Sequence, residues 1–155
     1  MDLKSLKFYT FEDLWLKGFR SVPDEKGIYA VLVPDQFEVQ FLDDTTAIKT
    51  YRGKNLLYPA YDLGTKYNCS DKKLLYIGKA GGESNKLRQR IRQYVKYGCG
   101  EANNHRGGRA IWQIRNNQQL LIGYGMCDEP ETKESALLAE YFNQYGTFPV
   151  ANWRY

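Results

Sequence analysis

Two tyrosines stand beside glycines in two apolar runs of this chain, Gly27–Val33 and Leu74–Ala80. Tyr29 closes a Gly-Ile-Tyr tripeptide in the first run, and Tyr76 opens a Tyr-Ile-Gly tripeptide in the second. Runs of this length and composition are typical of β-strands. Two such strands side by side would bring two phenols together, beside glycine backbone that another group can approach closely. A phenol has a pKa of about 10, so it can take a proton only where a nearby cation or metal-bound water lowers that pKa.

The positive charge of the chain is concentrated in one segment. Nine basic and two acidic residues lie between Lys79 and Arg115, a net charge of +7, whereas the whole chain carries +4. A field of this size attracts polyanions such as nucleic acid, although a solvated helix face is the alternative interpretation. The residues expected to bind nucleic acid are Lys86, Arg88, Arg92, Arg106 and Arg109.

A second group of chemically useful residues is the run His105-Arg106-Gly107-Gly108-Arg109. Two glycines between two arginines let the backbone approach a phosphate while both guanidiniums bind it. His105 can then serve as a proton carrier near neutral pH. A surface loop with a solvated histidine is the equally weighted alternative.

The two tripeptides resemble the defining motif of the GIY-YIG nuclease family, which cuts nucleic acid with the help of a metal ion. Further pieces follow in the order of that family. Leu87–Arg90 resembles its Leu-x-x-Arg helix, Leu137–Glu140 its glutamate-bearing helix, and Phe148–Asn152 its proline-containing tail that ends in asparagine. The resemblance covers roughly residues 26–154. It departs from the family in the 46 residues between the two motif tyrosines, where the family usually has a short hairpin.

The resemblance implies a divalent-metal-dependent endonuclease that hydrolyses phosphodiester bonds in DNA. In that assignment Tyr29 is the general base and Tyr76 orients the water or the phosphate, but the two roles can be exchanged. The guanidinium fork of Arg90 would bind phosphate oxygens. Glu140 would hold Mg²⁺ or Mn²⁺, and Glu134, which falls closer to the apolar stripe of its helix, is the fallback ligand. The further catalytic candidates are Lys79, His105 and Asn152, the last of which can instead satisfy backbone groups in the tail.

The elements that position these residues suggest a single domain of the α/β (α+β) class, spanning residues 1–155. Strands are expected over Gly27–Val33, Leu74–Ala80 and Leu120–Met126, in a small, mostly antiparallel three-stranded sheet. Helices that flank the sheet on both sides are expected over about Lys86–Tyr97 and from about Pro130 to Tyr145.

Two segments lie outside this expected core. In the N-terminal extension, residues 1–26, Thr10 has the position of an N-cap for a short helix that ends near Lys17. In the insertion, residues 34–73, Phe37, Val39 and Phe41 alternate with polar residues as in a strand. The pattern therefore predicts an added hairpin with a loop in the insertion, which either covers the core or forms an arm that contacts DNA.

Composition excludes several other classes of protein. Three scattered cysteines and one histidine disfavour a zinc site or a disulfide framework. The longest apolar run falls short of the roughly 18 residues of a membrane span, and the start of the chain has no apolar signal segment, which predicts a cytoplasmic protein. The expected partner is DNA, most readily double-stranded, with a homodimer or a partner protein supplying specificity. The rivals are a nucleic-acid-binding module that no longer cleaves and a structural or inhibitory protein with an acidic partner.

Overall fold

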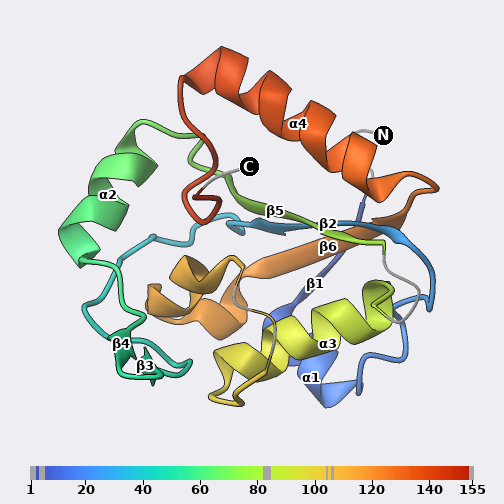
Figure 1. Cartoon of the computed structure of the whole chain (residues 1–155), viewed down its shortest axis with the longest axis horizontal. Coiled ribbons are helices and arrows are strands. Elements are labelled where there is room, and N and C mark those ends of the chain that lie inside the picture. Colours follow the sequence, from blue (N-terminus) through green and yellow to red (C-terminus); the bar gives the residue numbers. More distant parts are fainter. Residues whose placement is uncertain (1–2, 4–5, 82–84, 104, 106, 154–155) are drawn as a thin grey trace.

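The structure, a computed structural model, describes residues 3, 6–81, 85–103, 105 and 107–153. Its centre is a four-stranded antiparallel sheet in the order β1-β6-β2-β5 (Figure 1). These strands are β1 (Lys7–Thr10), β6 (Leu121–Met126), β2 (Gly27–Leu32) and β5 (Leu74–Ala80). The three expected strands are confirmed, with their antiparallel pairing, and the expected number of strands is wrong because β1 adds a fourth.

The fourth strand, β1, owes its place to packing on its neighbour. Phe8 pairs with Gly123 of β6, and a Cβ atom at Gly123 would clash with the Phe8 ring. An aromatic ring therefore lies where the glycine has no side chain. A strand of four residues carries too few positions for a periodic pattern to mark it.

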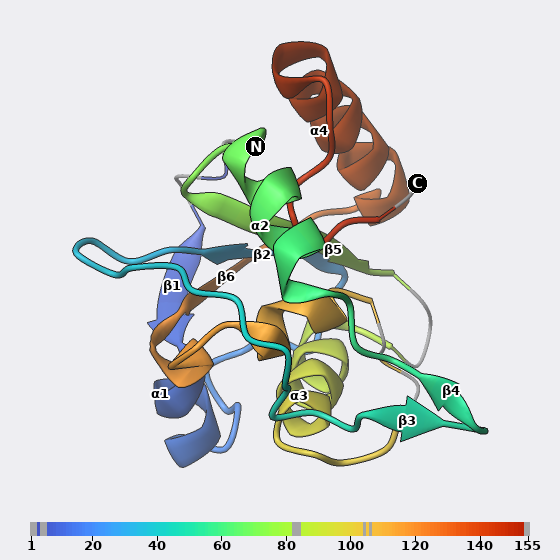
Figure 2. The same cartoon turned by 90° about the vertical axis from the view of Figure 1, so that its left-hand side faces the viewer.

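Helices cover both faces of the sheet, as Figures 1 and 2 show. On one face lie α1 (Phe11–Leu16) and α3 (Leu87–Gly98), and on the other lies α4 (Pro130–Tyr145). The three helices occur where the sequence predicts them. The expected N-cap is also confirmed, since the Thr10 side chain accepts a hydrogen bond of 3.1 Å from the Asp13 amide. Gly146 ends α4 with φ at +72°, a left-handed conformation that favours glycine.

Each face of the sheet has its own apolar core. The larger core lies under α3 and contains both motif tyrosines together with Tyr94 and Trp112. The smaller core lies under α4 and contains Ile28, Ala30, Ile77, Leu138 and Tyr141. The alternation of β2 therefore directs Tyr29 toward α3 and its two neighbours toward α4.

The insertion contains a hairpin, but at other residues than expected. Strands β3 (Thr50–Tyr51) and β4 (Lys54–Asn55) flank Arg52 and Gly53, whose φ angles of +50° and +76° suit a two-residue hairpin turn. The alternating segment around Phe37–Phe41 forms no strand beyond one isolated bridge from Phe41 to Ile114. Its aromatic and apolar side chains instead pack as an extended segment against the larger core.

Short helices also occur in the insertion and around Trp112, within the described residues. The insertion ends in α2 (Ala60–Asn68), which begins after Pro59 and which the sequence analysis missed. The apolar segment around Trp112, left unassigned from sequence, is the 3₁₀ helix η2 (Arg109–Gln113), followed by η3 (Asn117–Gln119). In the part of the chain that the structure describes, no helix has the length and apolar character needed to cross a membrane.

Candidate active site

Pairing of β2 with β5 sets the two motif tyrosines side by side, as their spacing predicts. Tyr29 lies opposite Gly78 in the register. Its ring crosses over that glycine so closely that a Cβ atom at Gly78 would stand only 2.8 Å from the Tyr29 hydroxyl oxygen. The ring centroids of Tyr29 and Tyr76 are 6.1 Å apart. The glycine of the second tripeptide thus leaves the space that the tyrosine of the first one fills.

The Tyr29 hydroxyl oxygen lies 2.7 Å from Nε2 of His105, and both side chains are fully buried. The His105 ring stacks on Tyr94 with 4.5 Å between ring centroids. Tyr94 in turn donates a hydrogen bond of 2.9 Å to the carbonyl oxygen of Gly108. The loop that carries His105 is thereby fastened to the tyrosines, so the interpretation of His105 as a solvated surface residue is wrong.

Burial decides the protonation of His105 and Tyr29. Desolvation, aided by the charge of Arg90, lowers the pKa of His105 to about 3, so the imidazole is neutral at pH 7. The expectation that His105 titrates near neutral pH is therefore wrong for this environment. Burial also raises the pKa of Tyr29 to about 12, although the Arg90 charge and hydrogen bonding with Tyr76 and Arg90 oppose the shift. The pKa of Tyr76 is raised well above its usual value, again mainly by burial.

Arg90 lies where the sequence places it, beside the tyrosines. Gly27 of β2 has no side chain, which lets the N-terminal end of α3 pack tightly on this strand. A Cβ atom at position 27 would clash with the Leu87 side chain and with the carbonyl oxygen of Gly125. Arg90 follows one turn later and is half-buried. Burial raises the pKa of both tyrosines and of Glu134, and the positive charge of Arg90 opposes this increase in all three.

Glu134 of α4, named above as the fallback ligand, is a carboxylate whose charge acts on this group. Its side chain is 12% exposed and lies 4.0 Å from the Lys79 ammonium. Burial raises the pKa of Glu134, and its charge acts on both motif tyrosines. Glu140 is exposed and lines a hollow of about 810 Å³ together with Ile77, whose side chain belongs to the core on the opposite face from the tyrosines. Glu134 belongs to the same helix but pairs with Lys79 near the end of β5. Glu140 instead lines its hollow with Leu74 at the start of that strand, so Glu140 stays outside this group.

Lys79 and Asn152 flank the site without joining the tyrosine face. Lys79 pairs with Glu131 at 3.8 Å as well as with Glu134. Asn152 bonds twice to the backbone of Ile77: its Oδ1 accepts from the amide at 3.0 Å, and its Nδ2 donates to the carbonyl at 2.9 Å. Asn152 therefore holds the outer edge of β5, which is the structural role left open from the sequence.

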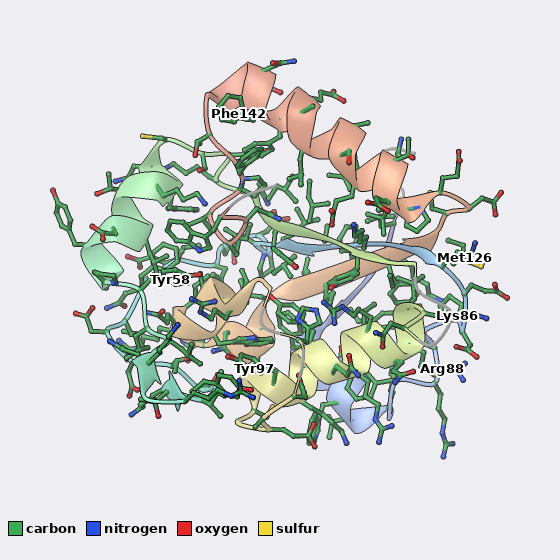
Figure 3. All side chains as sticks on the ribbon, in the orientation of Figure 1. Tyr58, Lys86, Arg88, Tyr97, Met126 and Phe142 are labelled. Atoms are coloured by element: carbon green, nitrogen blue, oxygen red, sulfur yellow. The ribbon has the colours of Figure 1, made fainter. Side chains whose placement is uncertain are left out.

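The basic residues of α3 divide between two faces. Lys86 is the N-cap residue, and Arg88 and Arg92 are exposed on the outer face of the helix (Figure 3 labels the first two). The Arg88 side chain is held in place because its Nε donates a 2.8 Å hydrogen bond to the carbonyl oxygen of Val22. These three residues are available to an external anion, whereas Arg90 faces the tyrosines.

Arg109 is tied to the insertion. Its Nε donates to the carbonyl oxygen of Leu56 at 3.1 Å, and its guanidinium lies 4.6 Å from the ring centre of Tyr58. Tyr58 stacks in turn on Trp153, with 4.5 Å between ring centroids. Arg106, the other arginine of this loop, lies outside the described residues.

Sequence reasoning missed two features of this site. Tyr94 was not singled out from the sequence, yet its ring packs against both His105 and the motif tyrosines. The bond between Tyr29 and His105 joins positions 76 residues apart, so no local pattern predicts it.

No group of three or more His, Cys, Asp or Glu side chains able to hold a metal occurs within the described residues. A single half-buried carboxylate such as Glu134 nevertheless suits Mg²⁺, which proteins bind through one or two carboxylates together with substrate phosphates. No family model matches the chain, and neither a curated protein nor a solved structure is significantly similar to it. The resemblance to GIY-YIG nucleases therefore rests on the motifs and on their arrangement alone.

Proposed function

We propose that this chain is a GIY-YIG-like, divalent-metal-dependent endonuclease that hydrolyses phosphodiester bonds in double-stranded DNA. The observation that supports the proposal is the convergence of four groups from four separate elements. Tyr29 comes from β2, Tyr76 from β5, Arg90 from α3 and Glu134 from α4. A guanidinium and a partly buried carboxylate that can hold a metal ion can supply the charge stabilisation that in-line attack on a phosphodiester needs, and the two phenols can orient or deprotonate the attacking water.

Binding of the substrate falls to the cations. The planar fork of Arg90 matches phosphate oxygens and stays charged at any working pH. The half-buried N-cap residue Lys86 and the exposed Arg88 and Arg92 of the same helix attract the DNA backbone and hold its register, without reading sequence. The choice of DNA over RNA rests on the resemblance.

Proton transfer falls to Tyr29 and His105. Because the pKa of Tyr29 is about 12, the phenol is protonated at pH 7 and can accept a proton from water only by passing on its own. Nε2 of the neutral His105, 2.7 Å away, is placed to receive it in the tautomer that carries its proton on Nδ1. Desolvation is the main cause of the low pKa of His105, so a bound phosphate, which offsets only the Arg90 charge, raises that pKa in part.

The proposed hydrolysis moves protons through Tyr29 and His105 while one bond to phosphorus forms and another breaks. Water gives a proton to Tyr29, Tyr29 gives its hydroxyl proton to His105, and the water oxygen attacks phosphorus as the bond to the leaving oxygen breaks. Glu134 would hold the Mg²⁺ or Mn²⁺ ion, which when bound supplies positive charge to the phosphate and the leaving oxygen. The leaving oxygen takes up a proton from solvent, His105 returns its proton to solvent through Tyr29, and Tyr76 orients the phosphate.

The test is cleavage of supercoiled plasmid with Mg²⁺ or Mn²⁺, comparing the parent chain with Tyr29→Phe and Glu134→Ala. Glu140→Ala is the matched control, because it removes a carboxylate from the same helix at an exposed position. The proposal expects nicking by the parent and by Glu140→Ala only. Loss of nicking in Glu140→Ala with retention in Glu134→Ala would return the metal ligand to Glu140.

A second candidate is a nucleic-acid-binding module of the same fold that does not cleave. The burial of both motif tyrosines favours it, because Tyr29 is 1% and Tyr76 7% exposed. The second candidate would be supported if the parent chain binds DNA with a steep salt dependence but cleaves no DNA tested with either metal.

A further inference from the structure

A shallow groove of about 280 Å³ runs between α1 and α3, on the outside of the molecule. Its walls come from the end of α1 and from one stripe of α3, the six lining residues being Trp15, Gly18, Phe19, Arg88, Arg92 and Lys96. Figure 1 shows the two helices beside one another below the sheet. The N-terminal extension, which lies outside the motifs that resemble the nucleases, thus supplies one wall of a basic hollow.

The cations of the groove form one row. Arg88, Arg92 and Lys96 recur at every fourth position of α3, a stripe about 12 Å long at 1.5 Å per residue. None of the three forms a salt bridge with any residue that the structure describes. At 3.6 residues per turn the members of this row lie roughly 120–160° around α3 from Arg90, so the row is separate from the tyrosine site.

The opposite wall holds an aromatic ring open to solvent. The chain turns sharply after α1, where Gly18 and Phe19 both have φ at +65°. The Phe19 amide donates to the carbonyl oxygen of Leu14, and the Gly18 amide donates to that of Trp15. A left-handed backbone conformation is uncommon for phenylalanine. At Phe19 this conformation buries the side-chain ring, which packs edge-on against Trp15. Trp15 itself stays 45% exposed beside the row of cations.

We infer that this groove binds an unpaired strand of nucleic acid, with a base against Trp15 and the phosphates along Arg88, Arg92 and Lys96. A row of cations alone attracts any polyanion, but an exposed indole adds a surface on which a free base stacks, and a base inside a duplex is not free to do so. The inference rests on the proposal that the tyrosine site acts on nucleic acid. The preferred substrate is then DNA in which a single strand adjoins a duplex.

The test measures binding without a divalent metal, so that no cleavage occurs. Fluorescence anisotropy compares a blunt duplex with the same duplex carrying a single-stranded extension, over a range of salt concentrations. We expect the parent chain to prefer the extended duplex, and Trp15→Ala to bind it roughly tenfold more weakly and without preference. Trp15→Phe keeps a ring and restores most of the preference. Arg92→Ala reduces the salt slope by about 0.7, the value for one contact to a single strand.

Two controls separate the groove from general effects. Leu16→Ala alters the exposed neighbour of Trp15, and Arg115→Ala removes an exposed arginine outside the groove, so both should bind like the parent. Equal preference in the parent and Trp15→Ala overturns the inference, even where plasmid cleavage confirms a nuclease. If Trp15→Ala loses the preference for the extended duplex and the parent does not cleave plasmid, the result supports single-strand binding in the groove and refutes the proposed nuclease activity.

Discussion

The ring of Tyr29 crosses over Gly78, its partner on the neighbouring strand, and occupies the space that any larger residue at position 78 would need. Gly78→Ala should therefore push the ring out of place, with a loss of about 1–3 kcal/mol in the free energy of unfolding. Urea denaturation measures the loss. Gly64→Ala is the control, because a Cβ atom there meets no other atom within 4 Å and alanine favours its helix by about 1 kcal/mol. Similar effects at the two positions would contradict this account.

The contact between Tyr29 and His105 gives the two tyrosines different expected roles. Tyr29→Phe removes the hydroxyl that is hydrogen-bonded to Nε2 of His105 and interrupts the proposed proton transfer, so the rate of cleavage should fall by about 10²–10⁴. Tyr76→Phe keeps that hydrogen bond and should reduce the rate less. Single-turnover cleavage at saturating protein separates these effects from DNA binding. A larger defect in Tyr76→Phe would exchange the two roles.

Stability should depend on pH through His105. Its pKa is about 3 in the folded chain and about 6.5 when unfolded, so below pH 6.5 the unfolded chain binds the additional proton. The free energy of unfolding should therefore decrease as the pH falls from about 6.5 toward 3, with a slope on the order of 1.4 kcal/mol per pH unit. Urea denaturation between pH 7 and pH 4 measures that slope. His105→Gln should flatten the curve, and an unchanged slope in that variant would assign the acid sensitivity to other groups.

Asn152 should matter for the structure of β5 more than for the chemistry. Asn152→Ala removes both hydrogen bonds to the Ile77 backbone, which should cost about 1–3 kcal/mol and speed hydrogen exchange at the Ile77 amide. The cleavage rate of the folded variant should stay close to that of the parent chain at low temperature. A loss of activity without a loss of amide protection would instead make Asn152 part of the chemistry.

The parts of the fold that local patterns encode were predictable. Strands β2, β5 and β6 and helices α3 and α4 have clear periodicity and clear end signals, so all five lie close to their expected bounds. Strand β1 and the placement of Phe37–Phe41 were not predictable, because packing against distant residues decides both.

The candidate site divides in the same way. The motifs predict that Tyr29, Tyr76 and Arg90 lie together, since each follows from a strand or a helix whose phase is clear. The choice between Glu134 and Glu140 depends on which turn of α4 reaches the edge of the sheet, and that depends on how the helix packs. The burial that keeps His105 neutral is likewise a tertiary effect, which residue type alone does not reveal.

The tail after α4 also bears on how the protein behaves at high concentration. The backbone amide of Ala151 donates to the carbonyl oxygen of Leu75, and the Asn152 side chain takes both backbone groups of Ile77. An incoming strand from another copy would therefore find these groups already bonded, which guards this side of the molecule against intermolecular β-pairing. A truncation before residue 149 should expose a strand edge rich in Leu, Tyr and Ile, so shortened chains should precipitate or form fibrils more readily than the intact one.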